Sequence, residues 1–253
     1  MKFSLTKNTK DWFGTTLFQI KAEMSFGSVS KGNFWGRIEK ESNLSQENNA
    51  WVYGDALVYD DARVYGDARV YGNALVYDDA RVYGNARVYG NALVYDGARV
   101  YGDAWVYDDA RVYGDAWIYG DARVYGDAWV YGDALVYDDA RVYGNAWVYG
   151  DARVYGDAWV YGDARVYGDA LVYDDARVYG DALVYGNALV SGKIKLELWQ
   201  CFARKEKDRD VSEVENAWII LLIKDYKPAE EEVMEMTVAD VEKLTGRKVK
   251  IIK

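Results

Sequence analysis

The aspartates of this sequence recur at regular intervals, and carboxylates spaced in this way can bind metal ions. Positions 50 to 192 contain 23 Asp and 11 Arg, a net charge of −12, against −10 for the whole chain. The densest group of carboxylates consists of Asp60, Asp61, Asp78, Asp79 and Asp96. Brought together, they could bind Ca²⁺, which takes oxygen ligands. Because Asp is also a common turn residue, we expect solvated turns there and no bound ion.

Six of the aspartates are followed by Arg three residues later, which predicts local charge compensation. The pairs are Asp60 and Arg63, Asp78 and Arg81, Asp96 and Arg99, Asp108 and Arg111, Asp138 and Arg141, and Asp174 and Arg177.

Other catalytic residue types are scarce. The chain has no His, so a His base, a His metal site and a Ser/His pair are all excluded. Positions 50 to 190 contain no Ser, Thr, Lys, Cys or Glu, and the lone Cys201 is expected to be a core thiol. The glycines are spread evenly along the repeats and form no phosphate-binding loop. We therefore predict a protein that is not an enzyme, with no catalytic residues, no cofactor and no metal.

The aspartates belong to a six-residue repeat, which must position them. From position 50 to 193 the chain consists of 24 units that follow the form Ala-x-Val-Tyr-(Gly/Asp)-(Asp/Asn), in which x is Arg, Leu or Trp; the exceptions are Gly97, Ile118, Ser191 and Lys193. Alternation along a short strand places Ala and Val on one side and x and Tyr on the other. The last two positions hold residue types that tolerate a positive φ and sharp turns. The pattern predicts coils of short strands that stack and bury Val and Ala.

The units resemble the hexapeptide repeats of left-handed parallel β-helices, in which three units make one triangular coil of 18 residues. The stretches 56–73 and 74–91 differ only at Asp67 against Asn85, which independently favours three units per coil. The resemblance covers 144 of the 253 residues. It implies an all-β solenoid, a triangular left-handed parallel β-helix of about eight coils with an N-terminal cap and a small C-terminal α+β module.

A second resemblance concerns the stretch KGNFWGRIEKESNLSQENNAWVYGDA, residues 31–56. It is similar to the lead-in of hexapeptide-repeat proteins common in prophage genomes, which are often labelled polymer-forming or acyltransferase-like. This resemblance implies a phage or prophage origin and leaves a degenerate acyltransferase-like protein as an alternative. The best-known enzymes of this architecture, acyltransferases and zinc-dependent carbonic anhydrases, rely on His, so no catalytic residues carry over.

The chain divides into three segments: an N-terminal capping segment at 1–49, the repeat β-helix at 50–193 and the C-terminal module at 194–253. In the last of these, the alternation in KIKLELW (193–199) and the apolar run AWIILLI (217–223) predict strands, and TVADVEKLTG (237–246) predicts a short helix. The polar N-terminus and the short apolar runs predict no membrane segment. We expect a cytoplasmic protein, in the host cell if it is phage encoded.

The outward positions offer a surface for binding. The repeat tyrosines are predicted to stack in three columns of eight, eight and seven. Arg and Trp, two of the three residue types at position x, are enriched with Tyr at binding hot spots. We expect six repeat tryptophans, Trp51 among them, to be exposed. The predicted protein-binding surface consists of Leu57, Leu75, Leu93, Trp105, Trp117, Trp129, Trp147 and Trp159.

Three classes of function remain. The first, which we predict, is a non-catalytic scaffold that binds a protein partner or itself, most simply as a homo-oligomer. The second is an acidic nucleic-acid mimic that inhibits a host DNA-binding protein as an anti-defence factor. The third is direct nucleic-acid binding through aromatic stacking, which net repulsion from phosphate opposes.

Overall fold

The computed structural model of the chain describes residues 1–186, 188–192, 195–197 and 201–202. They all belong to one compact unit, Met1–Leu222, and a second unit, Ile223–Lys253, lies outside the described residues. The strand predicted at 217–223 and the helix predicted at 237–246 also lie outside them. Among the described residues, none forms a helix with the length and apolar character that crossing a bilayer requires.

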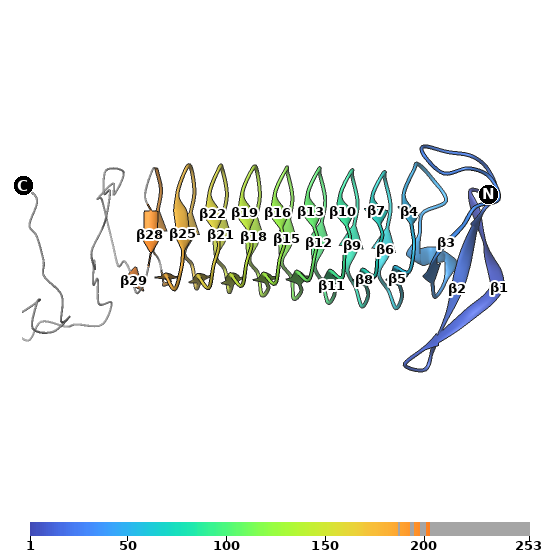
Figure 1. Ribbon diagram of the computed structural model, residues 1–253, viewed down its shortest axis with the longest axis horizontal. Helices are drawn as coiled ribbons and strands as arrows, with labels where there is room; N and C mark the ends of the chain where they lie inside the picture. The colour runs from blue at the N-terminus through green and yellow to red at the C-terminus, as the bar shows by residue number, and fades with distance from the viewer. Residues whose placement is uncertain (187, 193–194, 198–200, 203–253) are drawn as a thin grey trace, which may run out of the picture. The chain divides into compact units, whose positions relative to one another are not determined.

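The repeats form a parallel β-solenoid of about eight coils, as the sequence predicts. Each unit contributes a strand of two or three residues followed by a corner, and three units make one coil. Strands 18 residues apart are hydrogen-bonded neighbours, as Leu75 and Leu93 show. The coils stack along one axis, so their strands line up in three sheets (Figure 1).

Sheet 1 begins with the N-terminal strands β1 (Phe3–Trp12), β2 (Thr15–Ala22) and β3 (Phe34–Ile38). It continues with β5 (Leu57–Val58), β8 (Leu75–Val76), β11 (Leu93–Val94), β14 (Arg111–Val112), β17 (Trp129–Val130), β20 (Trp147–Tyr149), β23 (Arg165–Tyr167), β26 (Leu183–Val184) and β29 (Cys201–Phe202). Sheet 2 consists of β4 (Trp51–Val52), β7 (Arg69–Val70), β10 (Arg87–Val88), β13 (Trp105–Val106), β16 (Arg123–Val124), β19 (Arg141–Val142), β22 (Trp159–Val160), β25 (Arg177–Tyr179) and β28 (Lys195–Glu197). Sheet 3 consists of β6 (Arg63–Val64), β9 (Arg81–Val82), β12 (Arg99–Val100), β15 (Trp117–Ile118), β18 (Leu135–Val136), β21 (Arg153–Val154), β24 (Leu171–Val172) and β27 (Leu189–Val190). The strands β28 and β29 extend sheets 2 and 1 beyond position 193.

The core is a continuous column of Ala and Val. Every repeat Ala and every inward Val, with Ile118 in one unit, is buried. Backbone hydrogen bonds join one coil to the next: the Leu75 N–H donates to the Ala92 carbonyl at 3.0 Å, and the Tyr77 N–H to that of Val94 at 3.1 Å. The N–H groups of each coil therefore point toward the following coil, and the carbonyl groups toward the preceding one. The cap at the N-terminal end must supply donors.

The corners confirm the predicted turn chemistry. The first corner position has a positive φ in all 24 units, 59° to 72° where it is Gly and 53° to 58° where it is Asp. The coils also approach closely there, because a Cβ added to Gly84 would lie 2.9 Å from the Gly102 nitrogen. Gly meets both demands without strain, and Asp is among the few other residues that adopt this conformation readily.

A small antiparallel sheet covers the N-terminal end of the solenoid. Strands β1 (Phe3–Trp12) and β2 (Thr15–Ala22) form a hairpin, and β3 (Phe34–Ile38) pairs with β2 on one side and, in parallel, with β5 on the other. A 3-10 turn, η1 (Glu41–Asn43), follows β3.

Side chains and backbone of this cap donate to the carbonyl groups of the first coil. The Arg37 N–H donates to the Ala56 carbonyl at 3.0 Å, and the Asn43 side-chain amide to those of Asp60 and Ala62, both at 2.9 Å. The Lys2 ammonium donates to the Ala50 carbonyl at 2.9 Å and to two neighbouring carbonyls. Burial lowers the pKa of Lys2 to about 8. The cap thus satisfies polar groups that would otherwise be buried without partners.

Candidate protein-binding surface

The outward column of sheet 1 carries the longest run of predicted surface residues. Adjacent strands pair in register, so the x residues form one row along the solenoid. From the cap onward this row consists of Leu57, Leu75, Leu93, Arg111, Trp129, Trp147, Arg165 and Leu183.

Four members of the row stack on one another, and we call them the tryptophan stack: Arg111, Trp129, Trp147 and Arg165. The two indole rings lie 5.1 Å apart and within 7° of parallel. The guanidinium of Arg111 covers the outer face of Trp129 at 4.7 Å, and that of Arg165 covers Trp147 at 4.8 Å. A guanidinium is attracted to the face of an indole ring by cation–π interaction and planar stacking. The stack is therefore ordered by contacts within the single chain.

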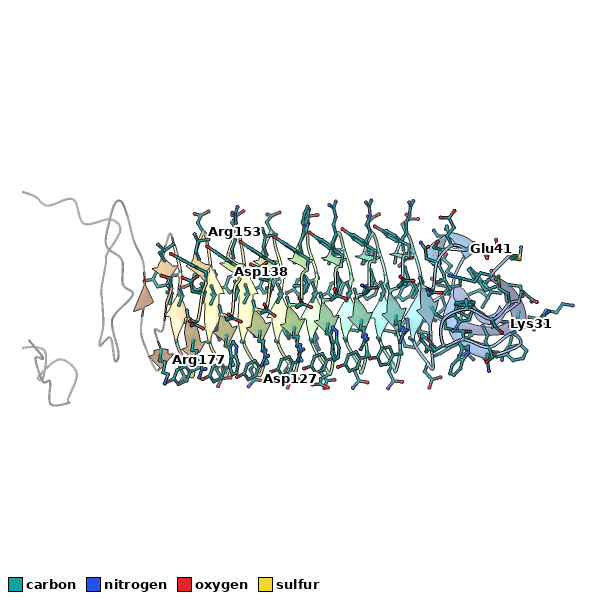
Figure 2. All side chains as sticks on the ribbon, turned by 90° about the horizontal axis from the view of Figure 1, so that it is seen from above. Lys31, Glu41, Asp127, Asp138, Arg153 and Arg177 are labelled. Carbon is teal, nitrogen blue, oxygen red and sulfur yellow. The ribbon has the colours of Figure 1, made fainter. Side chains whose placement is uncertain are left out.

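Arginines also cover Trp105, Trp117 and Trp159 on the other two sheets. On sheet 2, Trp105 lies between Arg87 and Arg123, at 4.7 and 5.1 Å, and Trp159 lies between Arg141 and Arg177, at 4.9 and 4.7 Å. On sheet 3, Arg99 lies 4.7 Å from the Trp117 ring. Figure 2 shows Arg153 and Arg177 extending outward on different sides of the solenoid. Sequence reasoning missed these contacts, although Arg and Trp 18 residues apart at position x would have indicated them.

Tyrosine ladders run beside each row, as predicted. Ring centroids of neighbouring coils are 4.7 to 5.3 Å apart and nearly parallel, except that Tyr53 meets Tyr71 edge-on at 87°. In sheet 1, the edge of Tyr113 also contacts Trp129 at 6.3 Å between centroids. Burial raises the pKa of Tyr113 and of Tyr131 above the ordinary value of 10.0.

The cap covers part of the predicted surface, which requires two corrections. Trp51 has no exposed surface, because Phe3 and Phe26 pack edge-on against its ring at 6.0 and 5.1 Å. The expectation of six exposed tryptophans is therefore wrong for Trp51. Leu57 is only 2% exposed, so it cannot form part of the surface. The remaining predicted residues, Leu75, Leu93, Trp105, Trp117, Trp129, Trp147 and Trp159, are half-buried.

The carboxylates at the corners are arranged differently from the prediction. Within the described residues, the ion pairs are Lys21 with Glu23 and Lys40 with Asp61, and none joins a repeat Asp to an Arg. The six predicted pairs therefore form no direct ion pairs, and four of their arginines stack on tryptophan instead: Arg99, Arg111, Arg141 and Arg177.

The five predicted aspartates lie along the corner between sheets 1 and 3, in the three coils nearest the cap. Lys40 donates to Asp61 at 2.8 Å. Burial raises the pKa of Asp78, with Asp60 and Asp96 adding to the effect. Across the part of the chain that the structure describes, no three His, Cys, Asp or Glu side chains are grouped as metal ligands would be.

Comparison with known proteins supports the solenoid assignment. Residues 62–102, 104–132 and 134–192, more than half of the chain, match the YdcK Beta solenoid repeat family. No curated protein matches the chain. The matched residues span the repeats described above, including the whole tryptophan stack. The chain belongs to the YdcK Beta solenoid repeat family.

Proposed function

We propose that the chain is a non-catalytic scaffold that pairs with a second copy of itself through the outer face of sheet 1. The observation that carries this proposal is the preformed tryptophan stack. Its two indole rings are half-buried, leaving part of each ring and the flanking leucines open to a partner. Trp and Arg are the residue types that most often dominate the free energy of binding at protein interfaces.

The order of residues along the row favours a second copy over an unrelated partner. Centred between Trp129 and Trp147, the row reads Leu93, Arg111, Trp129, Trp147, Arg165, Leu183, which is the same in both directions. A two-fold axis through this centre would place like residues against like. A symmetric dimer uses the same patch on both copies, so the contact of Trp129 with Trp147 of the second copy would occur twice.

The pitch and the charges favour the same arrangement. Two copies share one spacing between coils, about 4.8 Å, so side chains that fit at one coil also fit at the next. Exposed aspartates border the face on both sides, with Asp109 and Asp127 on one corner and Asp115 and Asp133 on the other. The two-fold pairing places Arg165 of one copy opposite the coil of Asp109 and Asp115 on the second copy, and Arg111 opposite the coil of the exposed Asp163 and Asp169, which adds electrostatic complementarity.

The absence of catalytic residue types supports a scaffold over an enzyme. The sequence has no His, and the repeats present the same few residue types at every coil. Catalysis by carboxylates needs groups held in unequal environments within a pocket. The repetition of one unit works against such differences.

Light-scattering mass measured against concentration tests the proposal. The parent chain should reach twice its mass of 28.8 kDa. The double variant Trp129→Arg, Trp147→Arg should stay monomeric, because burying unpaired guanidinium groups in an interface is costly. Both substitutions introduce Arg, which position x already accepts in other units, so the double variant should fold. Circular dichroism would verify this. The matched control is Trp117→Arg on sheet 3, which should dimerise like the parent.

A parent that stays monomeric at high concentration would contradict self-association. An acidic nucleic-acid mimic is the alternative, and salt distinguishes the two. A complex held by mimicry of phosphates should weaken steeply as salt rises, whereas an aromatic interface should respond little.

A further inference from the structure

A shallow hollow lies on sheet 2 where the solenoid meets the cap. It has a volume of about 270 Å³ and is lined by Ser28, Tyr53, Arg69, Tyr71 and Arg87. It opens where the tyrosine ladder of sheet 2 is interrupted. Tyr53 turns edge-on to Trp35, 5.4 Å away, and its hydroxyl lies 3.2 Å from that of Ser28, so its ring does not stack on Tyr71.

Two arginines from neighbouring coils form one side of the hollow. Arg69 and Arg87 are partners in the parallel register of β7 and β10. The far face of the Arg87 guanidinium is covered by Trp105 at 4.7 Å, which orients that group. Within the described residues neither arginine forms an ion pair, and both are half-buried. Two adjacent cations without a counterion provide a strong attraction for an anion.

The corners around this pair contain amides in place of carboxylates. The second corner position is Asp in most units, but it is Asn at 73, 85 and 91, three of the positions that border these two coils. The Asn73 amide donates to Asn91 at 3.1 Å, and Asn91 donates to Asp109 at 3.0 Å. The nearest corner carboxylate, Asp67, accepts both the backbone and the side-chain N–H of Asn49, at 3.1 and 2.7 Å. Of the four second corner positions that border β7 and β10, only position 67 therefore carries a carboxylate, so negative charge is sparser here than at most corners of the solenoid.

We infer that this hollow binds a phosphate group. A tetrahedral dianion matches two guanidinium groups in charge, and arginine forks bind phosphate oxygens through paired N–H donors. The hydroxyl groups of Ser28 and Tyr53 can donate to the remaining oxygens. The ring of Tyr71 at the wall leaves room for an aromatic or sugar substituent, so the phosphate could be free or part of a monoester. The site lies on sheet 2 and is independent of the proposed dimer face.

Calorimetric titration of the full chain with inorganic phosphate at low ionic strength tests the inference. We expect saturable binding to one site per chain. Arg69→Leu and Arg87→Leu, which introduce a residue that position x accepts elsewhere, should each weaken binding about tenfold or more, because each removes a charge-assisted contact. The matched control is Arg123→Leu. It removes the same charge and the other cation–π contact of Trp105, but lies outside the hollow, so binding should be unchanged.

Two results would overturn the inference. One is the absence of saturable binding heat with millimolar phosphate. The other is an equal loss of phosphate affinity in Arg123→Leu and Arg87→Leu, which would indicate a general effect of net charge. Phenyl phosphate, titrated in parallel, distinguishes the sources of the group. Tighter binding than inorganic phosphate supports an aromatic monoester, and equal binding supports recognition of the phosphate alone. Because the measurement does not depend on association, it can fail while the mass of the parent still doubles, and the reverse also holds.

Discussion

The indole rings of Trp129 and Trp147 stack face to face, 5.1 Å apart and 7° from parallel, on neighbouring coils of sheet 1. Arg111 and Arg165 cover their outer faces. The same spacing of about one coil recurs in the tyrosine ladders, so the outward rings are regularly spaced along the solenoid. This order has consequences for stability and for association.

The tyrosine ladders should stabilise the fold pair by pair. Tyr119 stacks on both Tyr101 and Tyr137, at 4.9 Å each, whereas Tyr173 has one ladder neighbour, Tyr155, because position 191 is Ser. At about 1 kcal/mol per stacked pair, Tyr119→Ala should cost about 1 kcal/mol more than Tyr173→Ala. Urea unfolding of the two variants measures the difference. Equal losses would mean that stacking adds nothing beyond the burial of each ring.

The ladders also predict an alkaline limit to stability. Burial raises the pKa of Tyr89, Tyr119 and Tyr143 to about 12, against 10.0 for an ordinary tyrosine. Between these values the folded chain retains phenol protons that the unfolded chain has lost. The free energy of unfolding should therefore be fully maintained below pH 10 and fall as the pH rises toward 12. Absorbance of phenolate and circular dichroism, followed together, should change in one steep transition. Gradual ionisation near pH 10 with the fold intact would contradict this expectation.

The buried Lys2 should stabilise the fold by donating hydrogen bonds where the cap meets the first coil. Its ammonium donates to the carbonyl groups of Glu47, Asn48 and Ala50. Lys2→Met would leave these acceptors without that donor, and we expect a loss of about 2 kcal/mol in the free energy of unfolding. The control is Lys31→Met at an exposed position, which should change little. A Lys2→Met variant as stable as the parent would show that water can replace the ammonium.

Burial, together with the neighbouring carboxylates, should make the charged form of Asp78 unfavourable. Its pKa is raised by burial and by Asp60, Asp96 and Asp79. The folded state therefore favours the protonated carboxyl, and stability associated with this group is lost as the pH rises through its folded pKa. Asp78→Asn should raise the melting temperature at pH 7, and the gain should vanish near pH 3. Asp79→Asn, at the exposed neighbour, is the control and should show little change at either pH. Millimolar Ca²⁺ should shift the melting temperature of the parent little.

The repeat made most of the fold predictable. A unit with Ala and Val facing one way and a tolerant corner after every fourth residue has few ways to bury its apolar side, and the duplicated stretches 56–73 and 74–91 set three units per coil. The positive φ at Asp60 and the parallel Tyr ladders follow from the same pattern. The prophage origin and the cytoplasmic location remain predictions.

The features that the sequence did not predict depend on contacts that do not repeat along the chain. Trp51 is buried by Phe3 and Phe26, which come from an N-terminal segment whose fold no repeat specifies. The hollow on sheet 2 exists because Trp35 of the cap turns Tyr53 out of its ladder. Sequence distance pairs four of the arginines with aspartates, but position x places each of the four beside a Trp in an adjacent coil: Arg99, Arg111, Arg141 and Arg177. Stacking on a ring costs less solvation than an ion pair, so the vertical neighbour prevails.

Crosslinking between copies tests the proposed two-fold pairing most directly. The substitution Cys201→Ser first removes the single native thiol. Two proteins are then made on this background, one with Leu93→Cys and one with Leu183→Cys. The two-fold axis places position 93 of one copy opposite position 183 of the other, while the two positions 93 are separated by five coils, about 24 Å. A short bismaleimide should therefore crosslink a mixture of the two proteins efficiently and each protein alone hardly at all. Efficient crosslinking of either protein with itself, or none in the mixture, would contradict the account.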